Sequence, residues 1–206
     1  MSSTVLYVDE LKASSSRPSM KQYLRIRPAL VLHHIFLSFW PPLSKAKVHL
    51  DVVGPIIGVL LLYLVLILGQ SALTSFSITP FLNIIVYLFV NSTISYGLMK
   101  IGKGALMYLE ILCLMGYSLY SHIITLLISY VFYHQSSDVI FCFCFILIGG
   151  LSSLRLVLIF LLSIHKPVVR LLVCTFSSTF HLLFLLYLYF SYIHQTFVFG
   201  GGPRKT

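Results

Sequence analysis

Three ionisable side chains lie within stretches of sequence that are otherwise apolar: Glu110, His122 and Arg155. An ionisable group inside a bilayer is costly, so such residues mark a site for a proton, an ion or a partner helix. Glu110 and His122 belong to one stretch and are twelve residues apart, which on a helix is roughly 18 Å. They therefore cannot touch each other. Glu110 is, however, the carboxylate nearest in depth to Arg155 if their two helices are adjacent.

Two hypotheses account for these residues. In the first, they surround a hydrated cavity through which a small solute or a lipid is transported. In the second, Glu110 is hydrated near the membrane surface, and His122 makes an interhelical hydrogen bond with Ser118 and Ser121 nearby. We favour the second hypothesis, because a packing role needs no further polar groups.

The motifs of known enzymes do not occur in the sequence. There is no His-Glu-x-x-His, no Gly-x-Ser-x-Gly and no phosphate-binding Walker loop. The chain has five acidic residues, which leaves little capacity for general acid and base catalysis, and its four cysteines lack the Cys-x-x-Cys spacing of a zinc site. The sequence therefore predicts a protein that is not an enzyme, with no catalytic, cofactor-binding or metal-binding residues.

Composition indicates that the bilayer is the solvent of this chain. Of its 206 residues, 58% are hydrophobic and 9% are charged, whereas a soluble domain has about 25% charged residues. The net charge of +9 comes from short Lys and Arg clusters between apolar runs. That pattern is typical of topology signals and of contacts with anionic lipid head groups, and it argues against nucleic acid as a partner.

Five apolar runs are long enough to predict an all-α protein with five transmembrane helices. The first begins after Asp51, and Pro80 suits the beginning of the second. The predicted spans cover approximately residues 52–68, 81–99, 106–131, 139–164 and 168–193.

The remaining sequence divides into three segments around this membrane domain of residues 51–194. Residues 1–28 are expected to form a flexible cytosolic arm, residues 29–50 a basic and apolar segment in the membrane interface, and residues 195–206 a short lumenal tail. The residues expected to contact the anionic lipid surface are Arg25, Arg27, Lys45 and Lys47.

The distribution of positive charge predicts the orientation in the membrane. Six Lys and Arg residues near span ends lie on one side: Lys45, Lys47, Lys100, Lys103, Lys166 and Arg170. The loops on the opposite side contain none, and its tail contains only Arg204 and Lys205. By the positive-inside rule, the N-terminus is predicted to be cytosolic and the C-terminus lumenal.

Small residues precede Arg155 in the fourth predicted span. An arginine in mid-bilayer costs roughly 2.5 to 3.5 kcal/mol, but each Leu, Ile, Phe or Val offsets about 0.3 to 0.6 kcal/mol of this, so the span still inserts. Gly149, Gly150 and Ser152 would allow a neighbouring helix to approach closely. Arg155 is then expected to face that neighbour, a hydrated pocket or a carboxylate.

Several short motifs resemble those of the Yip domain family. They are the acid-x-x-Gly-Pro of Asp51, Gly54 and Pro55, the Gly-Tyr-Ser-Leu of residues 116–119 and the Gly-Leu-Ser of residues 150–152. Residues 112–130, 149–155 and 170–194 are most similar to its third-member subfamily, also named killer lineage protein.

This resemblance implies a multi-pass protein of the Golgi membrane and early secretory pathway that supports vesicle traffic. It implies hetero-oligomers with another Yip-domain membrane protein, and Rab-type GTPases as further partners. The motif and helix-contact residues are Asp51, Gly54, Pro55, Glu110, Gly116, Tyr117, Ser118, His122, Gly149, Gly150, Leu151, Ser152 and Arg155. The alternative is a transporter of small solutes or lipids with a polar cavity around Glu110, His122 and Arg155.

Overall fold

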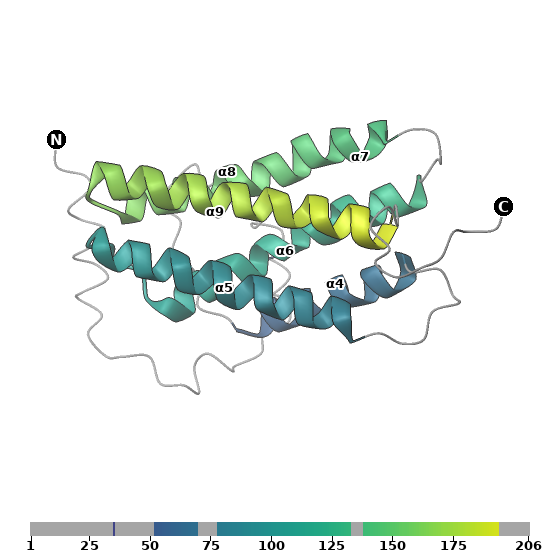
Figure 1. The fold of residues 1–206 in the computed structure, drawn as a ribbon, viewed down its shortest axis with the longest axis horizontal. Helices are drawn as coiled ribbons and strands as arrows, with labels where there is room; N and C mark the ends of the chain where they lie inside the picture. The colour runs from purple at the N-terminus through teal and green to yellow at the C-terminus, as the bar shows by residue number, and fades with distance from the viewer. Residues whose placement is uncertain (1–34, 36–51, 70–77, 133–137, 194–206) are drawn as a thin grey trace.

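All regular secondary structure in the described part of the chain is helical (Figure 1). The structure is a computed structural model that describes Ile35 and residues 52–69, 78–132 and 138–193. Its elements are α4 (Val53–Gly69), α5 (Thr79–Ile101), α6 (Tyr108–Val131), α7 (Val139–Cys144), the π-helical segment η1 (Phe145–Gly149), α8 (Gly150–Ser163), α9 (Pro167–Leu188) and the π-helical segment η2 (Tyr189–Ile193). The prediction of an all-α fold is confirmed for these residues.

Four of the described helices are long and apolar enough to cross a membrane. They are Thr79–Ile101, Tyr108–Val131, the continuous rod Val139–Ser163 formed by α7, η1 and α8, and the rod Pro167–Ile193 formed by α9 and η2. Their bounds agree with the predicted spans to within two residues. Helix α4 has 17 residues and extends about 26 Å, which is less than the roughly 30 Å of a bilayer's hydrocarbon core.

Local sequence accounts for several helix ends. Proline is among the first residues of both α5 and α9, where its missing N–H has no helical partner to lose. The α5 helix ends at Ile101, and the N–H of the next residue, Gly102, donates to the Leu98 carbonyl at 2.9 Å. Between α8 and α9 only residues 164–166 are not helical, so these two helices are forced to lie side by side and antiparallel.

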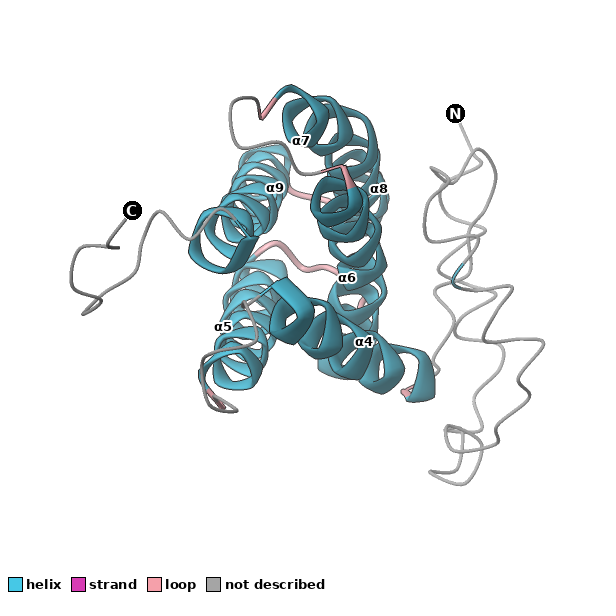
Figure 2. Cartoon of the chain, turned by 90° about the vertical axis from the view of Figure 1, so that its right-hand side faces the viewer, coloured by secondary structure: helices cyan, strands magenta, loops and turns pink. Residues whose placement is uncertain are grey.

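Helix α6 is the central element of the bundle. Viewed along the bundle, it lies among the other helices (Figure 2). In its most apolar 18-residue window 72% of the residues are buried, against 33% in each of the other three spans. A helix surrounded in this way can carry polar side chains without exposing them to lipid.

Helix α4 covers only part of the length of α6. Its first turn lies against Gly116 and Tyr117, in the third turn of α6, and its last residue, Gly69, lies against Tyr192. Eight residues of α6 precede Gly116, so α4 begins about 12 Å further along the bundle than α6 does. Figure 1 shows this displacement of α4 toward one end of the bundle.

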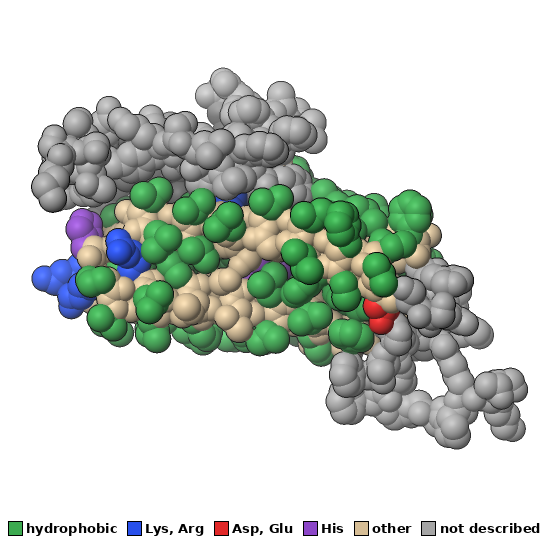
Figure 3. Space-filling view, turned by 90° about the horizontal axis from the view of Figure 1, so that it is seen from above, with side chains coloured by type: hydrophobic (Ala, Val, Ile, Leu, Met, Phe, Trp, Pro, Cys, Tyr) green, Lys and Arg blue, Asp and Glu red, His purple; other side chains and the backbone are tan. Residues whose placement is uncertain are grey.

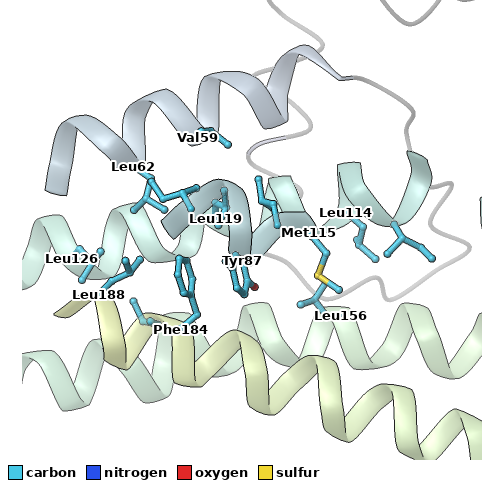
Figure 4. Close-up of a cluster of buried hydrophobic side chains, with 14 of the residues drawn as sticks. Val59, Leu62, Tyr87, Leu114, Met115, Leu119, Leu126, Leu156, Phe184 and Leu188 are labelled. Atoms are coloured by element: carbon cyan, nitrogen blue, oxygen red, sulfur yellow. The ribbon is translucent and has the colours of Figure 1, made fainter. Parts of the chain in front are cut away.

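The core between the helices is mainly aliphatic and aromatic (Figure 4). Leu62 of α4, Leu119 of α6 and Leu188 of α9 are fully buried. Large apolar side chains also cover the outside of the bundle (Figure 3), as expected for a surface in contact with lipid acyl chains.

Several predicted segments lie outside the described residues. They include the arm with Arg25 and Arg27, the interfacial segment with Lys45 and Lys47 except for its Ile35, Asp51 and the tail.

Candidate functional site

The centre of the bundle contains a hydrogen-bonded histidine, His181 of α9, that is fully buried. Its Nδ1 atom lies 2.8 Å from the Tyr87 hydroxyl and 3.5 Å from Ser118 Oγ, and its Nε2 atom lies 3.4 Å from Ser152 Oγ. A neutral ring with its proton on Nε2 accepts from Tyr87 and donates to Ser152. One side chain therefore hydrogen-bonds α9 to α5 and α8, and it also lies against α6 at Ser118 and His122.

A second histidine packs against the first. The rings of His122 and His181 have centroids 4.2 Å apart, and Tyr87 stacks on Phe184 beside them at 3.9 Å. His122 Nδ1 lies 3.4 Å from Ser121 Oγ of its own helix. Its Nε2 atom has no hydrogen-bond partner among the described residues. No interhelical side-chain hydrogen bond of His122 occurs among the described residues; its ring instead packs against the His181 ring.

The polar surface continues along α5 and α6. Asn91 donates from Nδ2 to the Tyr87 hydroxyl and to Met115 Sδ, each at 3.4 Å. Ser118 and Ser121 donate to backbone carbonyls of their own helix, which lets a hydroxyl be buried without an interhelical partner. In the described part of the chain, the buried polar atoms without a hydrogen-bond partner are Asn91 Oδ1, Ser92 Oγ, Ser95 Oγ, His122 Nε2 and Thr125 Oγ1.

Glycines allow α4 to pack closely on α6. A Cβ added at Gly116 would overlap Pro55, and a Cβ added at Gly54 would overlap the Tyr117 ring. The Tyr120 hydroxyl donates to the Gly54 carbonyl at 2.8 Å. Backbones that approach this closely need residues without side chains, so the structure brings together two motifs that are far apart in the sequence.

Arg155 and Glu110, whose pairing the sequence left open, do not form an ion pair. In the described part of the chain, Glu110 instead accepts a hydrogen bond at Oε2 from the Met107 N–H at 2.7 Å, which caps the beginning of α6. Arg155 is half-buried in α8, and its electrostatic neighbour is the Tyr117 phenol. Arg155 is eight residues from the end of α8, so the two groups lie at different depths.

The remaining motif residues of α8 and η1 have different environments. Gly149 is buried, and a Cβ there would lie 3.1 Å from Leu185 of α9. Gly150 has no atom within 4 Å of such a Cβ, and Leu151 is exposed. Ser152 faces His181, while the adjacent Ser153 hydrogen-bonds Ser178. Only part of this small-residue cluster is therefore used within the chain.

The structure does not place Glu110, His122 and Arg155 around one cavity. A cavity of about 480 Å³ lies at the turn between α5 and α6, and none of the three lines it. A groove of about 360 Å³ lies on the outer face of α9, and none of them lines it either. In the described residues, no group of three or more His, Cys, Asp or Glu side chains is arranged to hold a metal ion.

Comparison with known families decides the relationship. A family model described as the YIPF3 C-terminal domain matches residues 28–193. The chain belongs to this Yip-type family. The resemblance predicted from the short motifs is therefore confirmed, and the match covers all described helices. No solved structure matches this Yip-family chain.

The sequence prediction missed His181, Tyr87 and Asn91. Each lies in an apolar helix, and a single polar residue in such a helix does not by itself predict a site. Their spacing was an available signal, because Tyr87 and Asn91, like Ser177 and His181, are four residues apart and lie on one helix face. The sequence contains no sign that the two faces point toward each other.

Proposed function

We propose that this Yip-family chain is a non-catalytic, multi-pass protein of the Golgi and early secretory pathway. It supports vesicle traffic and Golgi organisation by assembling with another Yip-domain membrane protein, and Rab-type GTPases are further partners. The observation that carries this proposal is the family match over residues 28–193.

The arrangement of polar side chains supports a packing role over transport. His181 contacts Tyr87, Ser118 and Ser152 on three other helices, and the His122 ring packs against the His181 ring. Glu110 caps its own helix. A transporter needs polar groups that face a hydrated path near the bilayer midplane, whereas these groups face one another.

The proposed topology has five spans, with a cytosolic N-terminus and a lumenal C-terminus. In it, α4 is the first span. Its length of about 26 Å suits the thin membranes of the early secretory pathway, about 27 Å in the endoplasmic reticulum, and longer helices adapt by tilting. Arg25 and Arg27 of the arm and Lys45 and Lys47 of the following segment would then contact the anionic cytosolic leaflet.

Arg155 is the residue proposed to recognise the partner. It is half-buried, its electrostatic neighbour among the described residues is the Tyr117 phenol, and nearby Gly150 leaves open space beside α8. A guanidinium in this position is stabilised by a carboxylate on an adjacent helix. The partner is therefore expected to present an acidic side chain at this depth.

The test is affinity purification of the full chain from membranes in mild detergent, with identification of the co-eluting proteins. We expect a second Yip-domain protein in a fixed ratio to the chain. The variant Arg155→Leu should reduce its recovery by about tenfold, equivalent to about 1.4 kcal/mol, and should weaken Golgi retention. Leu154→Ile, on the exposed neighbouring residue, is the matched control. Unchanged recovery and retention in Arg155→Leu would show that Arg155 is not the determinant.

A further inference from the structure

The turn between α5 and α6 forms a cavity of about 480 Å³ at one end of the bundle. Its lining consists of Tyr96 and Lys100 from α5 and residues 104–109 from the turn and the beginning of α6. Two long membrane helices end here, so the cavity lies at the height where head groups meet acyl chains. Tyr96 and Tyr108 are aromatic residues of the kind that concentrate at this boundary.

The wall of the cavity holds a cation beside two phenol rings. Lys100 Nζ lies 5.3 Å from the centroid of the Tyr96 ring, within the range of a cation–π interaction. The rings of Tyr96 and Tyr108 pack edge to face at 5.6 Å, and the Tyr108 hydroxyl lies 3.5 Å from Thr93 Oγ1. An ammonium group next to a hydroxyl is suited to a phosphate group.

The adjacent α8–α9 turn adds positive charge to the same end. The two turns are in contact, because the Ala105 N–H donates to the Ser163 carbonyl at 3.4 Å and Gly102 packs against Ile164. Figure 3 shows the basic side chains gathered at this end and acidic atoms toward the other. The cations of the two turns are Lys100, Lys103, Lys166 and Arg170.

One carboxylate lies beside the cavity, against the four cations of this end. Glu110 Oε2 accepts a hydrogen bond at 2.7 Å from the backbone N–H of Met107, which lines the cavity. The Asp138 carboxylate belongs to the opposite end, where it accepts from the Tyr189 hydroxyl at 2.6 Å. The cavity therefore lies in a field that attracts anions from the membrane surface.

The apolar part of the lining favours a lipid as the source of the anion. Met107 and Leu109 line the cavity and are 64% and 45% exposed, so they can contact the first carbons of an acyl chain. The volume exceeds what one phosphate group needs and accommodates a substituted ring. We propose that this cavity binds the phosphorylated head group of an inositol phospholipid. The proposal does not depend on the Yip-domain partner.

The test uses the full chain in nanodiscs of phosphatidylcholine. These contain, at equal total head-group charge, either a phosphatidylinositol monophosphate or phosphatidylserine, and native mass spectrometry measures the retained lipid. We expect the phosphoinositide to be retained at least about tenfold more strongly, a difference of about 1.4 kcal/mol. Equal retention of both lipids would overturn the proposal, because it would indicate attraction by surface charge alone.

Two variants and one control separate a site from a charged surface. Lys100→Gln removes the cation of the lining, whereas Lys103→Gln makes the same charge change in the same turn at a residue outside the lining. We expect phosphoinositide retention to fall at least about tenfold for Lys100→Gln. For Lys103→Gln we expect it to fall at most about fivefold, which corresponds to about 1 kcal/mol for one cation at the membrane surface. Equal losses would contradict the proposal.

A third variant tests the cavity without altering charge. Ala105 is exposed and lines the cavity, so Ala105→Leu fills space there while the bundle core is untouched. We expect phosphoinositide retention to fall by about tenfold with an unchanged thermal midpoint and elution volume. Wild-type retention in this variant would overturn the proposed position.

Soluble inositol bisphosphate identifies the source of the ligand. If it binds the chain in phosphatidylcholine nanodiscs as tightly as the lipid does, the site takes free phosphate compounds and the lipid assignment is wrong. Weak competition by the soluble head group is the expected result. Loss of the Yip-domain partner in the purification experiment would leave all of these outcomes unchanged, so the two proposals fail separately.

Discussion

At the scale of single residues, the two buried histidines contribute unequally to the bundle. Both ring nitrogens of His181 have partners on other helices, whereas His122 Nε2 has none among the described residues. Hydrogen bonds between membrane helices typically stabilise by about 0.6 kcal/mol and at most about 1.7 kcal/mol. A buried group that loses its partner costs about 1 to 3 kcal/mol. The asymmetry of the two histidines should therefore be measurable.

The first prediction compares His181→Leu with His122→Leu. His181→Leu removes the partner of Tyr87 and Ser152, so we expect it to destabilise the bundle by about 1 to 3 kcal/mol. His122→Leu removes a contact within α6 and the ring contact with His181 but leaves no buried partner unsatisfied, so its cost should be below about 1 kcal/mol. Thermal unfolding in detergent measures both. A cost for His122→Leu equal to or larger than that for His181→Leu would contradict this account of the network.

At the scale of helices, the contact between α4 and α6 depends on small residues. Gly116 faces Pro55, and Gly58 faces Tyr120, whose ring would lie 3.2 Å from an added Cβ. The contact is close because lipid offers helices little hydrophobic drive to associate, so packing must supply the attraction. An added methyl group would separate α4 from α6 along this contact.

The second prediction uses two glycines with opposite surroundings. Gly116→Ala should destabilise the bundle by about 1 to 3 kcal/mol, the usual cost of overpacking, because the new Cβ overlaps Pro55. Gly97→Ala is the matched control, since nothing lies within 4 Å of its added Cβ, and it should be neutral or stabilising by up to about 1 kcal/mol. Thermal midpoints in detergent report both, and equal midpoints would show that α4 does not pack as described.

The π-helical segment η1 affects the direction in which the side chains of α8 point. It lies directly before Gly150 and alters the angular position of the residues that follow, because a π turn contains more residues than an α turn. Ser152 and Ser153 then face α9, where they meet His181 and Ser178. The chain stays helical through Gly149 and Gly150.

At the scale of the whole molecule, charge is distributed unequally between the two ends of the bundle. Lys103 and Lys166 lie at one end, in turns that contact each other, and Ile78 lies at the other end, where it is 67% exposed. If the basic end is cytosolic, these positions lie on opposite sides of the membrane.

The third prediction tests this orientation with single cysteines. In a variant without Cys113, Cys142, Cys144 and Cys174, Lys103→Cys and Lys166→Cys should react with an impermeant maleimide in sealed microsomes. Ile78→Cys should react only after permeabilisation, because the bilayer then no longer shields the lumenal end. The reversed pattern would contradict the proposed orientation, and equal labelling of Lys103→Cys and Ile78→Cys would contradict the arrangement of α5 across the membrane.

The sequence alone determined the helical class, the four long spans and the family. These properties follow from the composition of each segment, since any uncharged run of sufficient length is helical and inserted in a bilayer. The motifs of residues 54–55 and 116–119 sufficed for the family resemblance without any knowledge of their contact.

The tertiary structure decided which residues meet. It excluded the Glu110–Arg155 pair, because the Glu110 carboxylate turns back to the Met107 N–H at the end of α6. It placed His181 at the centre and displaced α4 along α6. Depth and rotation of a helix depend on packing against its neighbours, and hydropathy is nearly the same for every choice of rotation. Only the assembled bundle therefore contains this information.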